Sequence, residues 1–159
     1  MADNYTTMNA RDAIFASKAS CYVTLNGERY LAMNLASFTA TLTPNVVTVG
    51  ILGRTTKGHK MAGAEGTFSG TMYYNTSIWR RCMYEYHKTG EFPYFEIQVT
   101  NEDPTSSVGL QTIILKDCLL SAAVLASFDV NTDVLTEDFN GTFDSWEMPQ
   151  EFTLMEGMQ

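Results

Sequence analysis

Apolar and polar residues alternate along most of this chain, and the first clear pattern is a pair of short strands. The segment CYVTLNGERYLAM, residues 21–33, places Asn26-Gly27 between two runs rich in apolar and β-branched residues. Asn-Gly readily supplies the positive φ angles that a two-residue turn between antiparallel strands requires. The pattern therefore predicts a β-hairpin near the start of the chain.

A period of two continues in LASFTATLTP, residues 35–44, where apolar and hydroxyl side chains alternate. The apolar set is Phe38, Ala40 and Leu42, and the hydroxyl set is Thr39, Thr41 and Thr43. Successive side chains of a strand point to opposite faces of the sheet. We therefore expect a strand with one apolar face and one wet, hydroxyl-bearing face.

Further short runs of β-branched and aromatic residues indicate a mainly β chain. They cover residues 46–52, 67–74, 94–100, 110–116, 123–130 and 135–143. Turn-forming residues, TNEDPTSS at 100–107, separate two of these predicted strands. The spacing is typical of an antiparallel β protein.

One segment, NTSIWRRCMYEYHKTG at residues 75–90, has helical spacing instead. Asn75 or Thr76 can cap the first turn, and Gly90 can take the left-handed conformation that ends a helix. We predict one α-helix over about 76–88, with its apolar stripe laid across the sheets. The residues of this stripe are Ile78, Trp79, Cys82, Met83 and Tyr86.

Length and cysteine content narrow the class of protein. A chain of 159 residues suits a single domain, 1–159, which buries about 68–70% of its unfolded surface without covalent staples. Cys21, Cys82 and Cys118 are far apart and lack metal-ligand spacing, so we interpret them as buried thiols. No segment has the pattern of a signal peptide or a membrane span, which leads us to expect a reducing cytoplasm.

Charge is divided unevenly along the chain. Residues 1–95 contain nine Lys/Arg and six Asp/Glu, whereas residues 96–159 contain one Lys and twelve Asp/Glu. A nucleic-acid-binding protein needs a basic surface to displace counterions, and the acidic half offers the opposite. Such a half can be a solvated surface, a surface that repels DNA, or the partner of a basic loop on a neighbouring copy.

The basic, glycine-rich segment GRTTKGHKMAGAEG, residues 53–66, partly matches a phosphate-binding loop. Gly53 and Gly58 have the required gap, but His59 comes before Lys60 and no hydroxyl residue follows the lysine. The next residues predict a strand, so the helix N-terminus that such a loop needs is missing. A mobile loop between strands is the favoured interpretation.

Other catalytic patterns are equally incomplete. His59 and His87 have no partner at catalytic or metal-ligand spacing, and GTFSG around Ser69 lacks the spacing and the helix of a nucleophile elbow. The acidic residues after 128 lack the order of a calcium loop. Two alternatives nevertheless stay open here: a small monomeric ligand-binding β-barrel, and a β-barrel hydrolase.

Three motifs in order carry a family resemblance that spans nearly the whole chain. They are LGRTTKGHKMAGAEGT, the helix ending in HKTGEFPYFEIQV, and LASFDV followed by the acidic TFDSWEMPQEF. Together they resemble the tail tube protein of contractile phage tails, in the form found in prophages, defective prophage elements and tail-derived bacteriocins. The resemblance implies a structural protein without enzymatic activity or cofactor.

The same resemblance implies a fold and an assembly. The fold is a two-sheet antiparallel β-sandwich or barrel with one flanking helix, similar to the tube protein of type VI secretion systems. Six copies form a ring, and rings stack into a tube inside a sheath, between baseplate and terminator proteins. The tube is assembled in the host bacterial cytoplasm and becomes part of a phage tail or of a released bacteriocin particle. In a phage, DNA passes through the lumen without specific binding.

Carried over to this chain, the resemblance assigns residues 53–66 to a long inter-ring loop. Its candidate interface residues are Arg54, Lys57, His59, Lys60 and Glu65. An N-terminal arm, residues 1–19 with Arg11 and Lys18, is expected to do similar work. We expect the hydroxyl face of Thr39, Thr41 and Thr43, with acids after residue 128, to line the lumen.

Overall fold

The computed structural model describes residues 7–155 and 157–158 of the chain, and these form nine strands and one α-helix. A short 3-10 turn, η1 (Ala10–Asp12), precedes the first strand. The elements that follow are β1 (Ala19–Leu25), β2 (Glu28–Leu31), β3 (Leu35–Val49), β4 (Gly58–Tyr73), α1 (Ile78–Thr89), β5 (Phe95–Glu102), β6 (Leu110–Ala122), β7 (Thr136–Asp138), β8 (Asn140–Phe143) and β9 (Ser145–Gln150). The expectation of a mainly β fold with one helix is confirmed.

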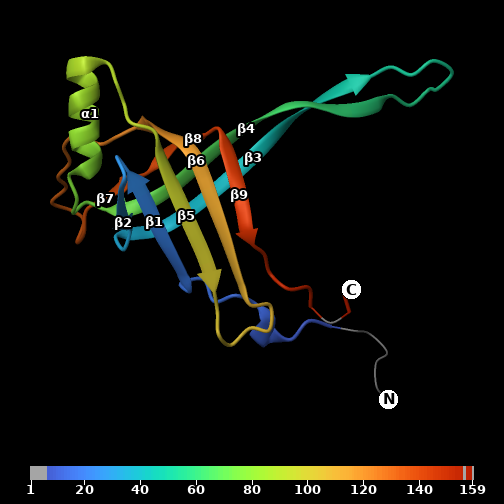
Figure 1. The fold of residues 1–159 in the computed structure, drawn as a ribbon, viewed down its shortest axis with the longest axis horizontal. Coiled ribbons are helices and arrows are strands. Elements are labelled where there is room, and N and C mark those ends of the chain that lie inside the picture. The colour runs from blue at the N-terminus through green and yellow to red at the C-terminus, as the bar shows by residue number, and fades with distance from the viewer. Residues whose placement is uncertain (1–6, 156, 159) are drawn as a thin grey trace.

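All strands are antiparallel and form one curled sheet in the order β2-β1-β5-β6-β8-β4-β3 (Figure 1). Strand β6 joins the two halves, because residues up to Cys118 pair with β5 while Leu119–Ala122 pair with β8. Strand β9 pairs with β6 and β7 pairs with β4. The two predicted sheets are therefore continuous with each other through β6.

The first hairpin forms as the sequence predicts. Asn26 and Gly27 have φ angles of 53° and 80°, and Leu25 pairs with Glu28 on either side of them. Both turn residues are in the left-handed region, where Asn and Gly carry the lowest cost. The pairing of β1 with β2 is thus set by a local signal.

The segment expected to be a long loop over 53–66 is mostly strand, so that prediction is wrong for Gly58–Gly66. Strand β4 begins at Gly58 and pairs with β3 along a hairpin that projects far from the body (Figure 1). Ala62 and Gly63 of β4 face the single residue Asn45, and Gly63 has φ 89°, which marks a bulge. Pairing with the β-branched residues of β3 outweighs the low strand propensity of Gly, Ala and Lys.

Two further strand predictions differ from the structure. Residues 123–130, expected to be a strand, follow β6 without regular structure, while the unpredicted β9 forms at Ser145–Gln150. No strand in the described part of the chain pairs with 123–130. A strand-like sequence stays irregular when nothing supplies its backbone partners.

The core lies between α1 and the concave side of the sheet and is rich in aromatic rings. Phe68, Phe95 and Phe139 are almost fully buried and pack against one another with centroid distances of 5.1–6.3 Å. Trp79 of α1 completes this cluster, at 4.8 Å from Phe95 and 5.1 Å from Phe139. The helix is therefore held to the sheet by aromatic packing.

The helix begins at Ile78 rather than 76, and its expected apolar stripe is only partly buried. Trp79 and Cys82 are buried and Ile78 and Met83 are half-buried, but Tyr86 is 51% exposed. The assignment of Tyr86 to the core face is wrong, because the last turn extends beyond the edge of the core. The end of the helix is as predicted: Gly90 has φ 78°, and its N–H donates to the carbonyl of Tyr86.

Replacing Trp79 by alanine is expected to lower the free energy of unfolding by about 3–5 kcal/mol, because it leaves a cavity among packed rings. The midpoint of urea unfolding measures this change. Tyr84→Ala is the matched control, since Tyr84 lies on the same helix and is 56% exposed. A similar, small shift in both variants would show that the ring cluster does not hold the helix.

Candidate assembly interface

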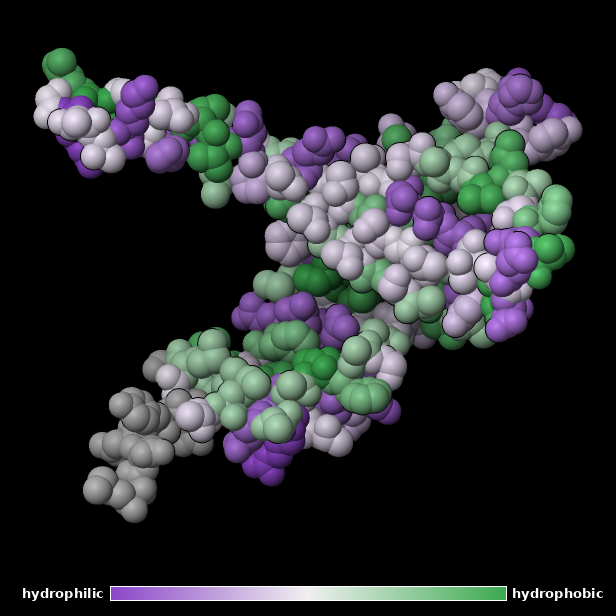
Figure 2. Space-filling view, turned by 180° about the vertical axis from the view of Figure 1, so that it is seen from behind, coloured by the Kyte–Doolittle hydropathy of each residue, from purple (hydrophilic) through white to green (hydrophobic). Residues whose placement is uncertain are grey.

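The projecting part of the β3–β4 hairpin, residues 42–65, is a surface that the isolated chain leaves uncovered; we call it the arm. Gly58 is its one partly buried residue. The eight residues of β4 that belong to it, Gly58 to Glu65, span about 26 Å at strand geometry. Figure 2 shows the arm standing clear of the body, with apolar and hydrophilic patches in turn along it. The exposed large apolar residues of the arm are Leu42, Val46, Val47, Val49, Ile51, Leu52 and Met61.

The charged residues predicted for the inter-ring loop all lie on the arm, but along it rather than in one cluster. Arg54 and Lys57 lie in the turn at the tip, which covers residues 50–57, whereas the other three lie on β4. In the register of the hairpin, His59 is opposite Thr48, Lys60 opposite Val47 and Glu65 opposite Thr43. Among the described residues, the ion pairs are Arg80–Glu137 and Lys116–Glu147, so these arm charges remain available to another molecule.

The three threonines of β3 extend into a wider polar surface. Thr39 is paired with Ser69 and Thr41 with Thr67, and Thr67 is in turn paired with Thr142 of β8. These hydroxyl residues therefore adjoin one another across β3, β4 and β8. The surface that they form carries hydroxyl groups, with Glu65 opposite Thr43 as a charged neighbour, and Thr39, Thr41 and Thr43 are exposed.

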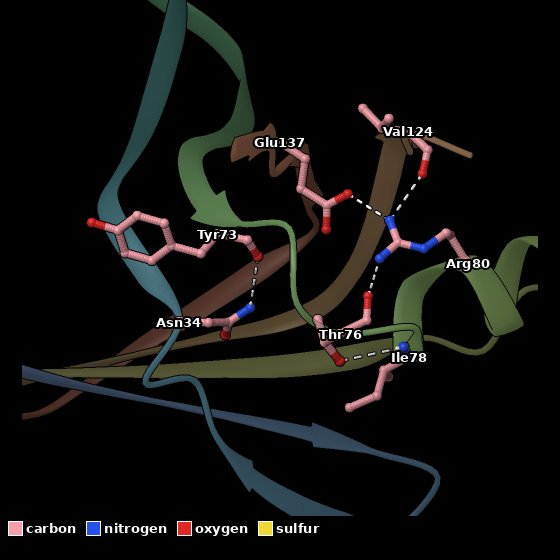
Figure 3. Close-up of polar contacts among 7 residues, drawn as sticks. All are labelled: Asn34, Tyr73, Thr76, Ile78, Arg80, Val124 and Glu137. Carbon is pink, nitrogen blue, oxygen red and sulfur yellow. Dashed lines mark hydrogen bonds and ion pairs between the residues drawn. The ribbon is translucent and has the colours of Figure 1, made fainter. Parts of the chain in front are cut away.

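A buried ion pair fixes the helix and the chain after β6 to the sheet (Figure 3). The Arg80 Nη1 atom lies 2.6 Å from Glu137 Oε2 and donates to the carbonyl of Val124 at 3.2 Å, while Nη2 donates to the carbonyl of Thr76. The Glu137 side chain is 2% exposed and that of Arg80 is 19% exposed. Residues near Val124 are thereby held beside the helix.

The described part of the N-terminal arm is attached to the body. The Phe15 N–H donates to Asp103 Oδ2 at 3.0 Å, and the Ser107 hydroxyl donates to Asp12 Oδ1 at 2.7 Å. The Thr105 hydroxyl and backbone N–H also donate to Asp103, so these bonds, with that from Phe15, lower the pKa of the Asp103 carboxyl below its usual value of 3.8. Residues 1–6 of the predicted N-terminal arm lie outside the described residues.

Acid is expected to release this attachment. Because the pKa of Asp103 is lower in the folded state, the unfolded chain takes up the proton first as pH falls. The stabilisation by Asp103 is thus complete above about pH 5 and declines as pH falls below about 4. Urea unfolding midpoints from about pH 7 to about pH 3 should fall more steeply for the wild type than for Asp103→Asn. Parallel curves would contradict this role.

The structure separates the groups that catalytic interpretations would need together. His59 lies on the arm and His87 at the end of α1, at opposite ends of the molecule. Burial raises the pKa of Cys21 to about 11 and that of Cys118 to about 12, so both thiols are protonated at neutral pH. Ser69 and the sequence GHK at 58–60 lie within β4. The described residues include no cluster of acids, His and Cys suited to a metal ion, and no helix long and apolar enough to cross a membrane.

The sequence analysis located the charges of the arm but missed its apolar surface and the free strand edges. A signal was present, because residues 35–53 and 118–128 contain no charged residue. Exposed strand edges of monomeric proteins are normally protected by charges or proline. The edge of β3 and the end of β6 therefore lack the charged residues that normally protect a strand edge.

Comparison with known proteins agrees with an assembling subunit. The profile of the family described as "Phage tail tube protein" matches residues 6–150. The phage-like element PBSX protein XkdM of Bacillus subtilis (strain 168) is 34% identical over 129 residues, which cover 81% of this chain and 86% of that protein.

Solved structures show the same fold at low sequence identity. A chain in the 6-fold symmetrised anti-feeding prophage baseplate is 10% identical, with TM-score 0.64, covering 90% of this chain and 97% of the other. A chain in the extended sheath-tube complex of the extracellular contractile injection system PVC is also 10% identical, with TM-score 0.58 and coverage of 82% and 88%. On the family match and the relationship to the PBSX protein, this chain belongs to the phage tail tube protein family.

Proposed function

We propose that the chain is the structural subunit of the inner tube of a contractile phage tail or a phage-tail-like bacteriocin. Copies assemble into six-fold rings with a central channel, and the rings stack into a tube. The observation that carries this proposal is the long, uncharged edge of β3 leading into an exposed arm with apolar side chains. A monomer gains nothing from such an arm, whereas a tube buries it.

The arm is proposed to reach the next ring. Its tip carries Arg54 and Lys57, with Lys60 close behind on β4, and the second half of the chain supplies the acidic partners on the adjacent ring. The arm's length of about 26 Å, from strand geometry, suits a contact outside the subunit's own ring. This role agrees with the exposure of all three cations and the absence of ion partners for them among the described residues.

The hydroxyl surface across β3, β4 and β8 is proposed to line the channel, together with acids from the second half of the chain. A phosphate backbone moving along such a wall meets no cation that would hold it. DNA would therefore pass without specific binding in a phage. We propose that this role is mechanical only, without enzymatic activity or a cofactor. The tube lies inside a sheath, between baseplate and terminator proteins. The particle is assembled in the host cytoplasm.

Self-assembly of the purified protein is the direct test of this function. We expect six-fold rings or stacked tubes in negative-stain electron microscopy as protein concentration is raised, because the free edges need partners. Light scattering on the same samples gives the mass of the assemblies. A protein that stays monomeric at millimolar concentration in both measurements would overturn the proposed function.

A further inference from the structure

The connection between β6 and β7, residues 123–135, exposes large apolar side chains; we call it the β6–β7 loop. Four of these side chains are 62–90% exposed: Leu125, Phe128, Val130 and Val134. They lie within ten positions of one another in a segment without regular structure. A group of exposed apolar side chains is typical of a surface that a second molecule covers.

The β6–β7 loop is attached to the body at both of its ends. The Arg80 guanidinium donates to the Val124 carbonyl at 3.2 Å (Figure 3), and the Tyr74 N–H donates to the Leu135 carbonyl at 3.1 Å. Arg80 is itself held by the buried Glu137. The loop is therefore presented in a defined place beside α1, although its backbone belongs to no strand or helix.

The charges of the β6–β7 loop are all negative. Asp129 and Asp133 are its only charged residues, and both are exposed. Neither belongs to the ion pairs of the described residues, which are Arg80–Glu137 and Lys116–Glu147. The loop thus combines two aspartates without an ion-pair partner in the described chain with four exposed apolar side chains.

The tip of the arm, residues 50–57, has the same construction with the opposite sign. Arg54 and Lys57 are its only charged residues, and both are exposed. Beside them, Leu52 is fully exposed and Ile51 is 41% exposed. The tip and the β6–β7 loop therefore match in charge as well as in apolar character, which is the pattern that specifies a contact between two protein surfaces.

The two matching surfaces lie at opposite ends of the molecule. The β6–β7 loop is beside α1, whereas the tip of the arm is the point farthest from α1 along the longest axis (Figure 1). One chain therefore cannot bring its own tip to its own loop. Rings that stack with a single polarity bring one end of each subunit against the other end of a subunit in the next ring.

We infer that the tip of the arm docks on the β6–β7 loop of a copy in the next ring. The two cations of the tip face Asp129 and Asp133, and its leucine and isoleucine pack on the apolar side chains of the loop. Apolar burial around the charges excludes water, which strengthens their attraction. This inference rests on the proposed function and identifies the acidic residues that receive the arm.

An exchange of charges between the two surfaces tests this contact. The loop variant Asp129→Lys with Asp133→Lys is expected to give single rings instead of tubes, because cations then meet cations. Adding Arg54→Glu and Lys57→Glu to the same chain makes the two surfaces opposite in sign again. We expect this fourfold variant to recover tubes of wild-type length in electron micrographs.

Chemical coupling tests whether the two surfaces touch. A carbodiimide joins a lysine amine to a carboxylate only when the two are in contact, and mass spectrometry identifies the joined peptides. In wild-type tubes we expect Lys57 joined to Asp129 or Asp133. Unassembled protein at low concentration should lack this product, because the tip and the loop of one chain lie at opposite ends.

Two further variants serve as controls. Glu96→Lys with Asp144→Lys reverses two exposed acids of the body and should neither shorten tubes nor rescue the arm variant. Asp133→Lys alone should also shorten tubes, and it leaves intact the hydrogen bond from the Asn131 N–H to Asp129 Oδ1. The urea midpoint of each variant should equal that of the wild type, since all the changed side chains are exposed.

The outcomes separate this contact from the proposed function. Tubes of normal length from the folded loop variant would overturn the contact and assign the β6–β7 loop to a protein outside the tube. The contact would equally be overturned by single rings from the fourfold variant, or by tubes in which Lys57 is not joined to the loop. Both results leave the tube function intact, whereas failure of the wild type to assemble would overturn function and contact together.

Discussion

Replacing Arg54, Lys57 and Lys60 by glutamate is expected to abolish the stacking of rings into tubes without affecting folding. All three side chains are exposed on the arm, and the described residues supply no ion partner within the chain. Each partly exposed pair contributes about 0.2–1 kcal/mol, but the arms of one ring act together. Reversal of three charges per arm turns the sum into repulsion. Tube length in electron micrographs measures the effect.

The charge-reversal experiment needs a folding control and a matched variant. Circular dichroism should be the same for the triple variant and the wild type. Reversal of Arg29, Arg81 and Lys88, which are exposed cations on the body, should leave tube length unchanged. Added salt should shorten wild-type tubes, as the charge reversal does, because it screens the same charges. Tubes of normal length from a folded triple variant would show that apolar contacts, and not arm charges, join the rings.

Replacing Gly141 by alanine is expected to prevent folding at ordinary temperature, with a loss above about 4 kcal/mol. Gly141 is buried in β8 between Leu120 and Phe68 in the ladder. A Cβ atom there would meet the Leu119 carbonyl oxygen in hard contact and lie 2.5 Å from the Phe68 ring. The backbone of Leu119 cannot move away without breaking its own pairing, so β8 would have to separate from β6, where the two halves of the sheet join.

Gly50→Ala is the matched control for this substitution. A Cβ atom at Gly50 meets nothing within 4 Å and its φ angle is not positive, so the urea midpoint should stay within about 0.5 kcal/mol of the wild type. The Gly141→Ala variant should instead show no cooperative unfolding transition in urea, or should yield no soluble protein. If Gly141→Ala unfolded at the wild-type midpoint, the close approach of β8 to β6 would not exist in solution.

Short-range signals in the sequence predict the parts of this fold that a few neighbouring residues decide. The Asn26-Gly27 turn forms because both residues tolerate positive φ, and the helix ends where Gly90 allows the left-handed conformation. The alternation through Thr39, Thr41 and Thr43 correctly predicts a strand, because its period is local. The family resemblance, confirmed by comparison, supplies the tube function that no local pattern indicates.

The tertiary structure decides what depends on a partner distant in the sequence. Gly58–Gly66 has the composition of a loop, yet it is a strand because β3 lies beside it. Residues 123–130 have the composition of a strand, yet they have no partner among the described residues. Tyr86 has core spacing but extends past the core, and Asp103 binds Phe15 across 88 positions. Helical turns and tight turns close within a few residues, whereas a strand is defined only by the chain that supplies its hydrogen bonds.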